Sequence, residues 1–564
     1  MKFSEFPYSR PDFAQFKKEF QQLIQSFQST NDVGELQKIF TDIYNRRRSF
    51  DTAMTLVSIR NSVNTTDEFY EKEQEFMDEN EPMYRDIVMQ FYKALIESKQ
   101  RTELEKIYGK QLFMLAELSI KTFSPEIIED LQKENQLTTE YTKLLASAKI
   151  EFRGNTYNLS GLTPFKLSPD RATRKEAHEK SDNWFSENHN RLDEIFDELV
   201  KLRHGMALKL GYKNFIGLGY GRMQRVDYNQ TMVEAFRENV RKHLVPLATQ
   251  LKTQQSKRLS LPALKYYDEG IDFLNGNAKP EGDPDWIVNH ATSMYDELSK
   301  ETGEFFHFML EHELMDLVNK PNKAGGGYCT YLSSYKAPYI FSNFNGTSHD
   351  IDVLTHEAGH AFQAFRSRNL TVDEYLSPTL EACEIHSMSM EFITWPWMQK
   401  YFGAQTDKYK YAHLTHALMF IPYGVAVDEF QHFIYANADA TPAERNTAWR
   451  NIEKKYLPLR DYDGNEYLEG GGFWQRQMHI YRSPFYYIDY TLAQICAFQF
   501  WKKSRENLSV AMKDYITLCD AGGSMSFLKL VELAGLKSPF EETTMQEVMG
   551  EAKNWLLNID DSAL

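Results

Sequence analysis

The chain has 564 residues, of which 42% are hydrophobic and 14% aromatic, so it can bury a large core. This composition excludes a disordered chain and a small domain held together by disulfides. The 80 acidic and 64 basic residues give a net charge of -16, which disfavours nucleic acid as a partner because its phosphates would be repelled.

No apolar run approaches the ~20 residues of a membrane-spanning helix, so we expect no membrane partner. At the N-terminus, Glu5 and Pro7 interrupt the apolar stretch that a secretory signal would require. The 4 cysteines are widely spaced and form no C-x-x-C pair, a pattern typical of reduced thiols. These features predict a cytoplasmic protein.

Residues 11–149 show a helical pattern, because apolar residues recur at spacings of three and four, as at Phe16, Phe20 and Leu23. Capping residues followed by proline or acids predict helix starts at residues 65–68, 124–126, 168–170 and 441–444. We therefore predict a mainly α fold. No linker or repeat separates the chain, so an N-terminal helical region (residues 1–160) and a second region (161–564) are expected to form one intertwined unit.

The best strand candidates lie at residues 328–332 and 338–344, bounded by glycines at 325–327 and by Asn345-Gly346. They predict a small sheet. Directly after it, residues 348–350 can cap a helix that continues through Leu354, Ala358 and Phe362.

This helix contains the pattern H-E-x-x-H at His356, Glu357 and His360. Helical geometry places the two histidines one turn apart on one face, where both can bind one metal ion. With 15 histidines in 564 residues, chance supplies about 0.03 such patterns per chain. The alternative is a pair of solvated surface histidines, but the apolar neighbours predict a buried helix. We interpret the pattern as a zinc site in which Glu357 takes a proton from water.

A third protein ligand is needed, and the predicted helix at residues 379–395 offers Glu381, Glu384, His386 and Glu391. Spacing alone leaves the choice open. Glu384 and Glu391 share one helical stripe, so Glu384 could bind the metal while Glu391 orients a histidine from behind. The alternative for this pair is a charged helix surface.

These residues resemble the thimet oligopeptidase and oligoendopeptidase F family of zinc metallopeptidases, including the Pz-peptidase-like members. The motif H-E-x-G-H, with Gly359, is followed by E-x-x-S-x-x-x-E from Glu384 to Glu391. Looser likeness covers about residues 160–500. The resemblance implies that His356, His360 and Glu384 bind one zinc ion per chain and that Glu391 supports them. It also implies a two-lobed helical molecule with its catalytic region in residues 161–564, whose deep channel admits short peptides and excludes folded proteins.

A third shared feature is a histidine followed by clustered tyrosines, here His479 and then Tyr481, Tyr486, Tyr487 and Tyr490. The spacing of this segment differs among relatives. We favour His479, Tyr486 and Tyr490 as catalytic residues, because a phenol or imidazole N–H can donate to the oxyanion of peptide hydrolysis. The alternative is that these aromatic side chains pack the core.

We therefore predict a zinc endopeptidase that hydrolyses internal bonds of oligopeptides. The strand containing Tyr339, Phe341 and Asn343 is expected to pair its edge with the substrate backbone. One alternative is an exopeptidase in which Arg476 or Arg482 binds a terminal carboxylate. The other is a helical peptide-binding protein with a structural zinc, although such sites are normally closed by a fourth Cys or His.

Overall fold

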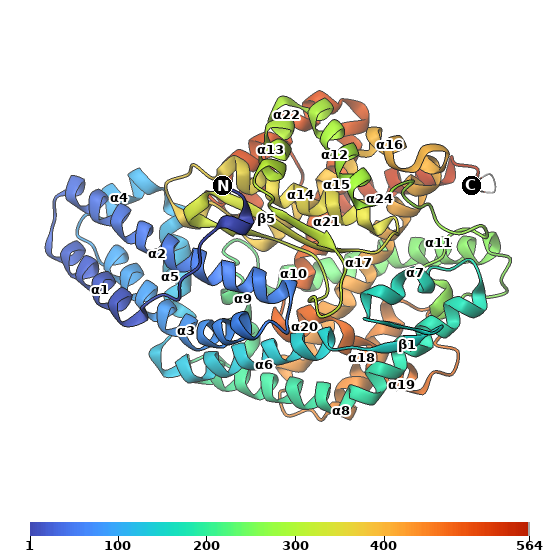
Figure 1. Cartoon of the computed structure of the whole chain (residues 1–564), viewed down its shortest axis with the longest axis horizontal. Coiled ribbons are helices and arrows are strands. Elements are labelled where there is room, and N and C mark those ends of the chain that lie inside the picture. Colours follow the sequence, from blue (N-terminus) through green and yellow to red (C-terminus); the bar gives the residue numbers. More distant parts are fainter. Residues whose placement is uncertain (562–563) are drawn as a thin grey trace.

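The computed structural model describes residues 1–561 and 564 and is mainly helical, as predicted (Figure 1). The N-terminal helices gather at one end of the molecule, and α6 and α8 run along one edge of it. No described helix combines the length and the apolar character that a membrane crossing requires. The first helices are α1 (Phe13–Ser29), α2 (Val33–Val63), α3 (Glu68–Ile96), α4 (Arg101–Tyr108), α5 (Lys110–Lys121), α6 (Ile128–Ala146), α7 (Thr163–Lys166) and α8 (Arg171–Lys209).

Side-chain caps set several helix starts at the predicted places. Asp67 accepts from the Phe69 and Tyr70 amides at the start of α3, and Asp170 accepts from the Thr173 amide at the start of α8. The later helices are α9 (Phe215–Arg222), α10 (Gln230–Asn239), α11 (Val245–Arg258), α12 (Pro284–Leu298), α13 (Lys300–Glu311), α14 (His349–Ser367), α15 (Leu380–Ile393), α16 (Gln399–Phe402), α17 (Thr406–Ala436), α18 (Pro442–Tyr456), α19 (Glu466–Glu469), α20 (Met478–Arg482), α21 (Tyr487–Glu506), α22 (Leu508–Ala521), α23 (Phe527–Leu533) and α24 (Glu542–Leu557).

A small sheet lies beside α14, as predicted, and contains β3 (Met315–Val318), β4 (Tyr328–Leu332) and β5 (Ala337–Phe344) in the order β3-β5-β4. β4 and β5 are antiparallel, whereas β3 is parallel to β5 and was missed by the sequence reading. A separate two-stranded hairpin joins β1 (Ile150–Phe152) and β2 (Asn155–Tyr157).

The prediction that the strand with Tyr339, Phe341 and Asn343 pairs with substrate is wrong. This strand, β5, is the central one and forms ladders with β4 on one side and β3 on the other. Tyr339 and Phe341 are buried, and the Asn343 amide donates to the carbonyls of Ala324 and Gly326. Because β5 has a neighbour on each side, the edge strands are β3 and β4, and of these two it is β4 whose residues line the cavity described below.

Helices α14 and α15 pack closely enough to bring their side chains to one point. A Cβ on Gly359 would lie only 2.6 Å from both the His386 carbonyl oxygen and the Ser387 Cα. These are backbone atoms and cannot rotate away. Glycine at this position of the H-E-x-G-H motif therefore permits the contact that places α15 against the two histidines of α14.

Candidate active site

Three side chains from these two helices converge as possible metal ligands. The Nε2 atoms of His356 and His360 lie 3.2 and 3.3 Å from the same Glu384 oxygen, Oε2. One ligand atom from each residue lies within 4.8 Å of the others. Two imidazole nitrogens and a carboxylate oxygen are a donor set that zinc prefers, with room left for a fourth ligand. The residues therefore fit one zinc ion.

Glu384 is held in place by neighbours on both of its oxygens. Ser387 Oγ donates to Oε2 at 2.8 Å, and the Tyr486 hydroxyl donates to Oε1. Burial opposes the charged form of Glu384, but His360 and His356 lower its pKa well below the usual value. The carboxylate is thus ionised and oriented toward the histidines.

Glu391 lies behind the cluster and connects it to residues that the sequence reading missed. Its Oε1 accepts from His356 Nδ1 at 2.7 Å, and its Oε2 lies 2.9 Å from His413 Nε2. Trp395 Nε1 donates to His413 Nδ1 at 3.2 Å, so His413 carries its proton on Nε2 and donates to Glu391. Burial opposes ionisation of Glu391, but the hydrogen bonds from His356 and His413 lower its pKa to about 2. This chain fixes the ring of His356 with Nε2 toward the metal position.

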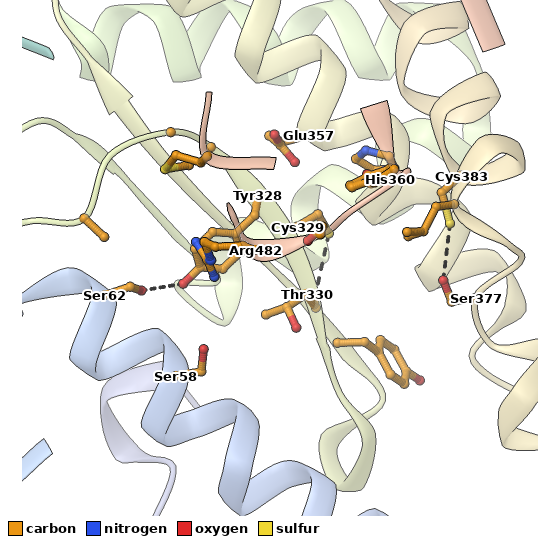
Figure 2. Close-up of a pocket in the computed structure, with 18 of the residues that line it drawn as sticks. Ser58, Ser62, Tyr328, Cys329, Thr330, Glu357, His360, Ser377, Cys383 and Arg482 are labelled. Atoms are coloured by element: carbon orange, nitrogen blue, oxygen red, sulfur yellow. Dashed lines mark hydrogen bonds between the residues drawn. The ribbon is translucent and has the colours of Figure 1, made fainter. Parts of the chain in front are cut away.

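Glu357 points into the cavity beside the histidines (Figure 2). It is only 5% exposed, and its Oε2 has no hydrogen-bond partner among the described residues. A Cβ on Gly327 would lie 3.1 Å from Glu357 Oε1, so the glycine loop leaves room for this carboxylate. Burial raises the pKa of Glu357, while the neighbouring histidines oppose that rise. A carboxyl group with a raised pKa is suited to taking and returning a proton.

His479, Tyr486 and Tyr490 all line the same cavity. His479 Nε2 lies 3.0 Å from the Tyr490 hydroxyl. On its other side, the Gln477 amide donates to His479 Nδ1 at 2.8 Å, and the Gln477 oxygen accepts from Tyr423 at 2.8 Å. His479 therefore has its proton on Nε2 and donates to Tyr490, so the Tyr490 O–H is not given to His479; the Tyr486 hydroxyl is its other hydrogen-bond neighbour.

Several residues that the sequence left open lie elsewhere. The side chains of Glu381 and His386 are buried outside the metal cluster. Tyr481 is buried and donates to the Leu192 carbonyl, and Tyr487 packs beside Phe420. Among the tyrosines considered, the structure brings only Tyr486 and Tyr490 to the cavity. Neither sequence pattern nor spacing could have found Gln477 or His413, because their roles depend on contacts between separate helices.

The cavity has a volume of about 860 Å³ and is lined by segments far apart in the sequence. Figure 2 shows Glu357 and His360 on one side, Ser58 and Ser62 of α2 on another, and Tyr328 of β4 between them. Residues of α6, α15, α20 and α21 also line it, together with the glycine loop at residues 324–327 and the segment between α14 and α15. The walls therefore come from both the N-terminal helices and the helices that carry the candidate metal ligands.

Comparison with known proteins decides the family. Residues 3–123 match the peptidase M3 N-terminal domain, and residues 165–550 match peptidase family M3. The chain belongs to peptidase family M3. The resemblance to oligoendopeptidase F that the sequence motifs indicated is thereby confirmed, and the chain is a peptidase by family.

This M3 chain is similar over its whole length to solved structures. It is 57% identical to PZ peptidase A with an inhibitor, with a TM-score of 0.99 and 100% of each chain covered. It is 52% identical to an oligoendopeptidase F from Bacillus anthracis, with a TM-score of 0.95, covering 100% of this chain and 99% of the other. An oligoendopeptidase F homolog of Borreliella burgdorferi is 25% identical over 456 residues, which cover 78% of this chain and 73% of that relative.

Proposed function

We propose that this M3 peptidase is a cytoplasmic zinc endopeptidase that cleaves internal bonds of short oligopeptides. The observation that carries the proposal is the convergence of His356, His360 and Glu384 on the wall of a large cavity, with the Glu357 carboxylate beside them. Zinc is the metal that this donor set favours, and the position left for a fourth ligand is typical of a catalytic site.

When bound, zinc supplies the Lewis acidity that polarises the scissile carbonyl and makes water more acidic. Glu357 accepts the proton of the attacking water and then delivers it to the leaving amine, so the C–N bond breaks with the proton balance closed. Burial and the charge of Glu384 raise the pKa of Tyr490 well above its ordinary value, so its phenol stays protonated. Its O–H turns from Tyr486 and donates to the carbonyl oxygen as negative charge develops there.

The free edge of β4 takes the role first assigned to β5. Tyr328, Cys329 and Thr330 of β4 line the cavity, and the β4 ladder with β5 leaves the opposite edge open. An extended peptide can pair its backbone with such an edge, a mode that reads the main chain and tolerates many side chains. The cavity volume of about 860 Å³ lies within the roughly 300–1,000 Å³ of ligand pockets, so it holds a peptide segment and excludes a folded domain.

The test is a mass-spectrometric time course on internally quenched peptides of different lengths, with a chelator and with zinc restored. Internal cleavage that stops with the chelator, returns with zinc and declines for long substrates is expected. Cleavage confined to a terminus would contradict the endopeptidase assignment, and activity that ignores the chelator would contradict the metal chemistry.

Glutamine variants of three glutamates distinguish the proposed metal ligand, Glu384, from the proposed proton acceptor and from an acid that does neither. Glu357→Gln should retain stoichiometric zinc but lose kcat by about 10³-fold, because only the proton acceptor is lost. Glu384→Gln should lose zinc, whereas Glu381→Gln, one turn earlier on α15, should keep both zinc and activity. Zinc content is measured by elemental mass spectrometry. Zinc retained by Glu384→Gln would overturn the ligand assignment.

A further inference from the structure

Three lysine and arginine side chains line the active-site cavity: Arg47, Lys143 and Arg482. Arg47 is paired with Glu374 at 2.6 Å, and Lys143 is paired with Glu71 at 2.8 Å. The Arg482 side chain has no hydrogen bond, ion pair or ring contact within the part of the chain that the structure describes. It is therefore a cation that faces the cavity with its donors free.

The Arg482 side chain is exposed to the water of the cavity, and no carboxylate of the described residues pairs with it. The protein around it lowers its pKa, which tyrosines and Asp78 partly oppose. The carboxylate that acts on it, Asp78, already accepts from Gln74 and Thr139 through its two oxygens. Arg476, the other arginine considered from the sequence, pairs with Asp182 at 2.8 Å and does not line the cavity. A guanidinium remains charged under these conditions and its planar donors match a carboxylate.

Arg482 lies where a bound peptide would pass. Its charge acts on Tyr328 at the start of β4 and on His479 among the catalytic donors. Figure 2 shows Arg482 beside Tyr328, with Ser58 and Ser62 of α2 on the facing wall. Next to Ser62, the buried Asn61 lines the same cavity with an Nδ2 that has no acceptor among the described residues. The Arg482 guanidinium and the Asn61 amide thus both offer unpaired hydrogen-bond donors to this part of the cavity.

We propose that Arg482 binds a carboxylate of the peptide substrate and gives the enzyme a preference for acidic peptides at one position relative to the cut. The carboxylate comes from an Asp or Glu side chain or from the C-terminus. The inference rests on the proposed peptidase function, since it assigns a specificity residue to that same cavity.

The test compares peptide pairs that differ only in one charge. One series places Glu or Gln at each position on either side of the scissile bond, and another has a free or an amidated C-terminus. The measured quantity is the ratio of kcat/KM within each pair for the wild type, Arg482→Met and Arg482→Lys. Lys143→Met, which removes an already paired cation from the same cavity, is the matched control.

For one position, the wild type should prefer the charged peptide, and Arg482→Met should lower that ratio by about 10- to 100-fold, the usual range for a charge-assisted hydrogen bond. Arg482→Lys should keep part of the preference, and Lys143→Met should keep the wild-type ratio. Loss confined to Glu/Gln pairs identifies a side chain as the ligand, and loss confined to free and amidated pairs identifies the terminus. Equal ratios in the wild type and Arg482→Met for every pair would overturn the proposal.

Binding separates this result from the proposed function. Calorimetric titration of the same peptide pairs into the Glu357→Gln background, with and without Arg482→Met, measures the preference without turnover. If the wild type cleaves none of the peptides, the peptidase proposal fails, and the binding ratio still decides whether Arg482 selects a carboxylate.

Discussion

At the scale of single residues, the site depends on hydrogen-bond partners that fix proton positions. Tyr423, Gln477 and His479 form a chain that ends at Tyr490, and burial lowers the pKa of His479 to about 4. The imidazole is therefore neutral at physiological pH, and its single N–H donates to Tyr490. The Gln477 amide is what decides this tautomer.

Replacing Gln477 by Glu should reverse the direction of the hydrogen bonds that run from residue 477 through His479 to Tyr490. A carboxylate accepts a proton from His479 Nδ1, so Nε2 becomes an acceptor and draws the Tyr490 O–H away from the cavity. We expect kcat to fall by about 10²-fold with a small change in KM, as for loss of one oxyanion donor. The acid limb of the pH–rate profile should also move to higher pH, because the new carboxylate raises the pKa of His479. Tyr423→Phe, which leaves the amide in place, should change kcat far less; equal effects of the two variants would contradict this role.

At the scale of elements, the candidate metal ligands meet because α14 and α15 approach closely along Gly359. His356 and His360 come from one helix and Glu384 from the other, so a small separation of the helices would pull the ligand atoms apart. α15 is buried along nearly its whole length, which leaves it little freedom to adjust.

Gly359→Ala should therefore lower both stability and zinc affinity. The new methyl meets the backbone of α15 at 2.6 Å, and such overpacking costs about 1–3 kcal/mol of unfolding free energy. Urea unfolding and competition with a chelator measure the two effects. Gly550→Ala in α24 is the matched control, because no described atom beyond its chain neighbours and its own helix backbone lies within 4 Å of the added Cβ, and alanine is the better helix former. A Gly359→Ala variant with wild-type zinc affinity would show that the close approach is not needed.

At the scale of the whole molecule, a buried polar contact joins the N-terminal helices to the segment between α14 and α15. Glu374 in that segment accepts from Tyr44 and Tyr92 and pairs with Arg47, all from α2 and α3. Burial opposes the charged form of Glu374, but Arg47 and the two hydroxyls lower its pKa. The predicted regions 1–160 and 161–564 thus share a core contact near the cavity, although their division stays a prediction.

Glu374→Gln should destabilise the protein by about 3–5 kcal/mol at neutral pH, because the buried Arg47 loses its counter-charge. A carboxyl group whose folded pKa is lowered contributes stability above its unfolded pKa, and this contribution is lost as the pH falls through the folded pKa. The difference in unfolding free energy between wild type and variant should therefore shrink as the pH falls below the ordinary pKa of glutamate. Urea unfolding across this pH range measures it.

The neighbouring Asp373→Asn is the control for that measurement. Asp373 pairs with Arg48, but burial raises its pKa, so its ionised form contributes less to folding. We expect a smaller destabilisation at neutral pH and the opposite pH trend. If Asp373→Asn lowered the unfolding free energy at neutral pH as much as Glu374→Gln does, the special role of the buried Arg47–Glu374 pair would be contradicted.

The sequence by itself determined the features that local periodicity encodes. The helical class, the caps at Asp67 and Asp170, and the strands beside α14 follow from spacing and residue type. The H-E-x-x-H spacing placed His356 and His360 on one helix face without any knowledge of the fold. For the third ligand, spacing left several acids open, and the family resemblance favoured Glu384.

Only the tertiary structure decided which groups meet across elements. The order β3-β5-β4 makes β5 the central strand and β4 an edge strand, which alternation along a strand cannot show because a central and an edge strand can carry the same pattern. The Gln477 chain, the Glu391–His413 contact and the unpaired Arg482 likewise arise from segments that are distant in sequence. Each depends on packing distances of a few ångströms, and no local pattern of residues carries that information.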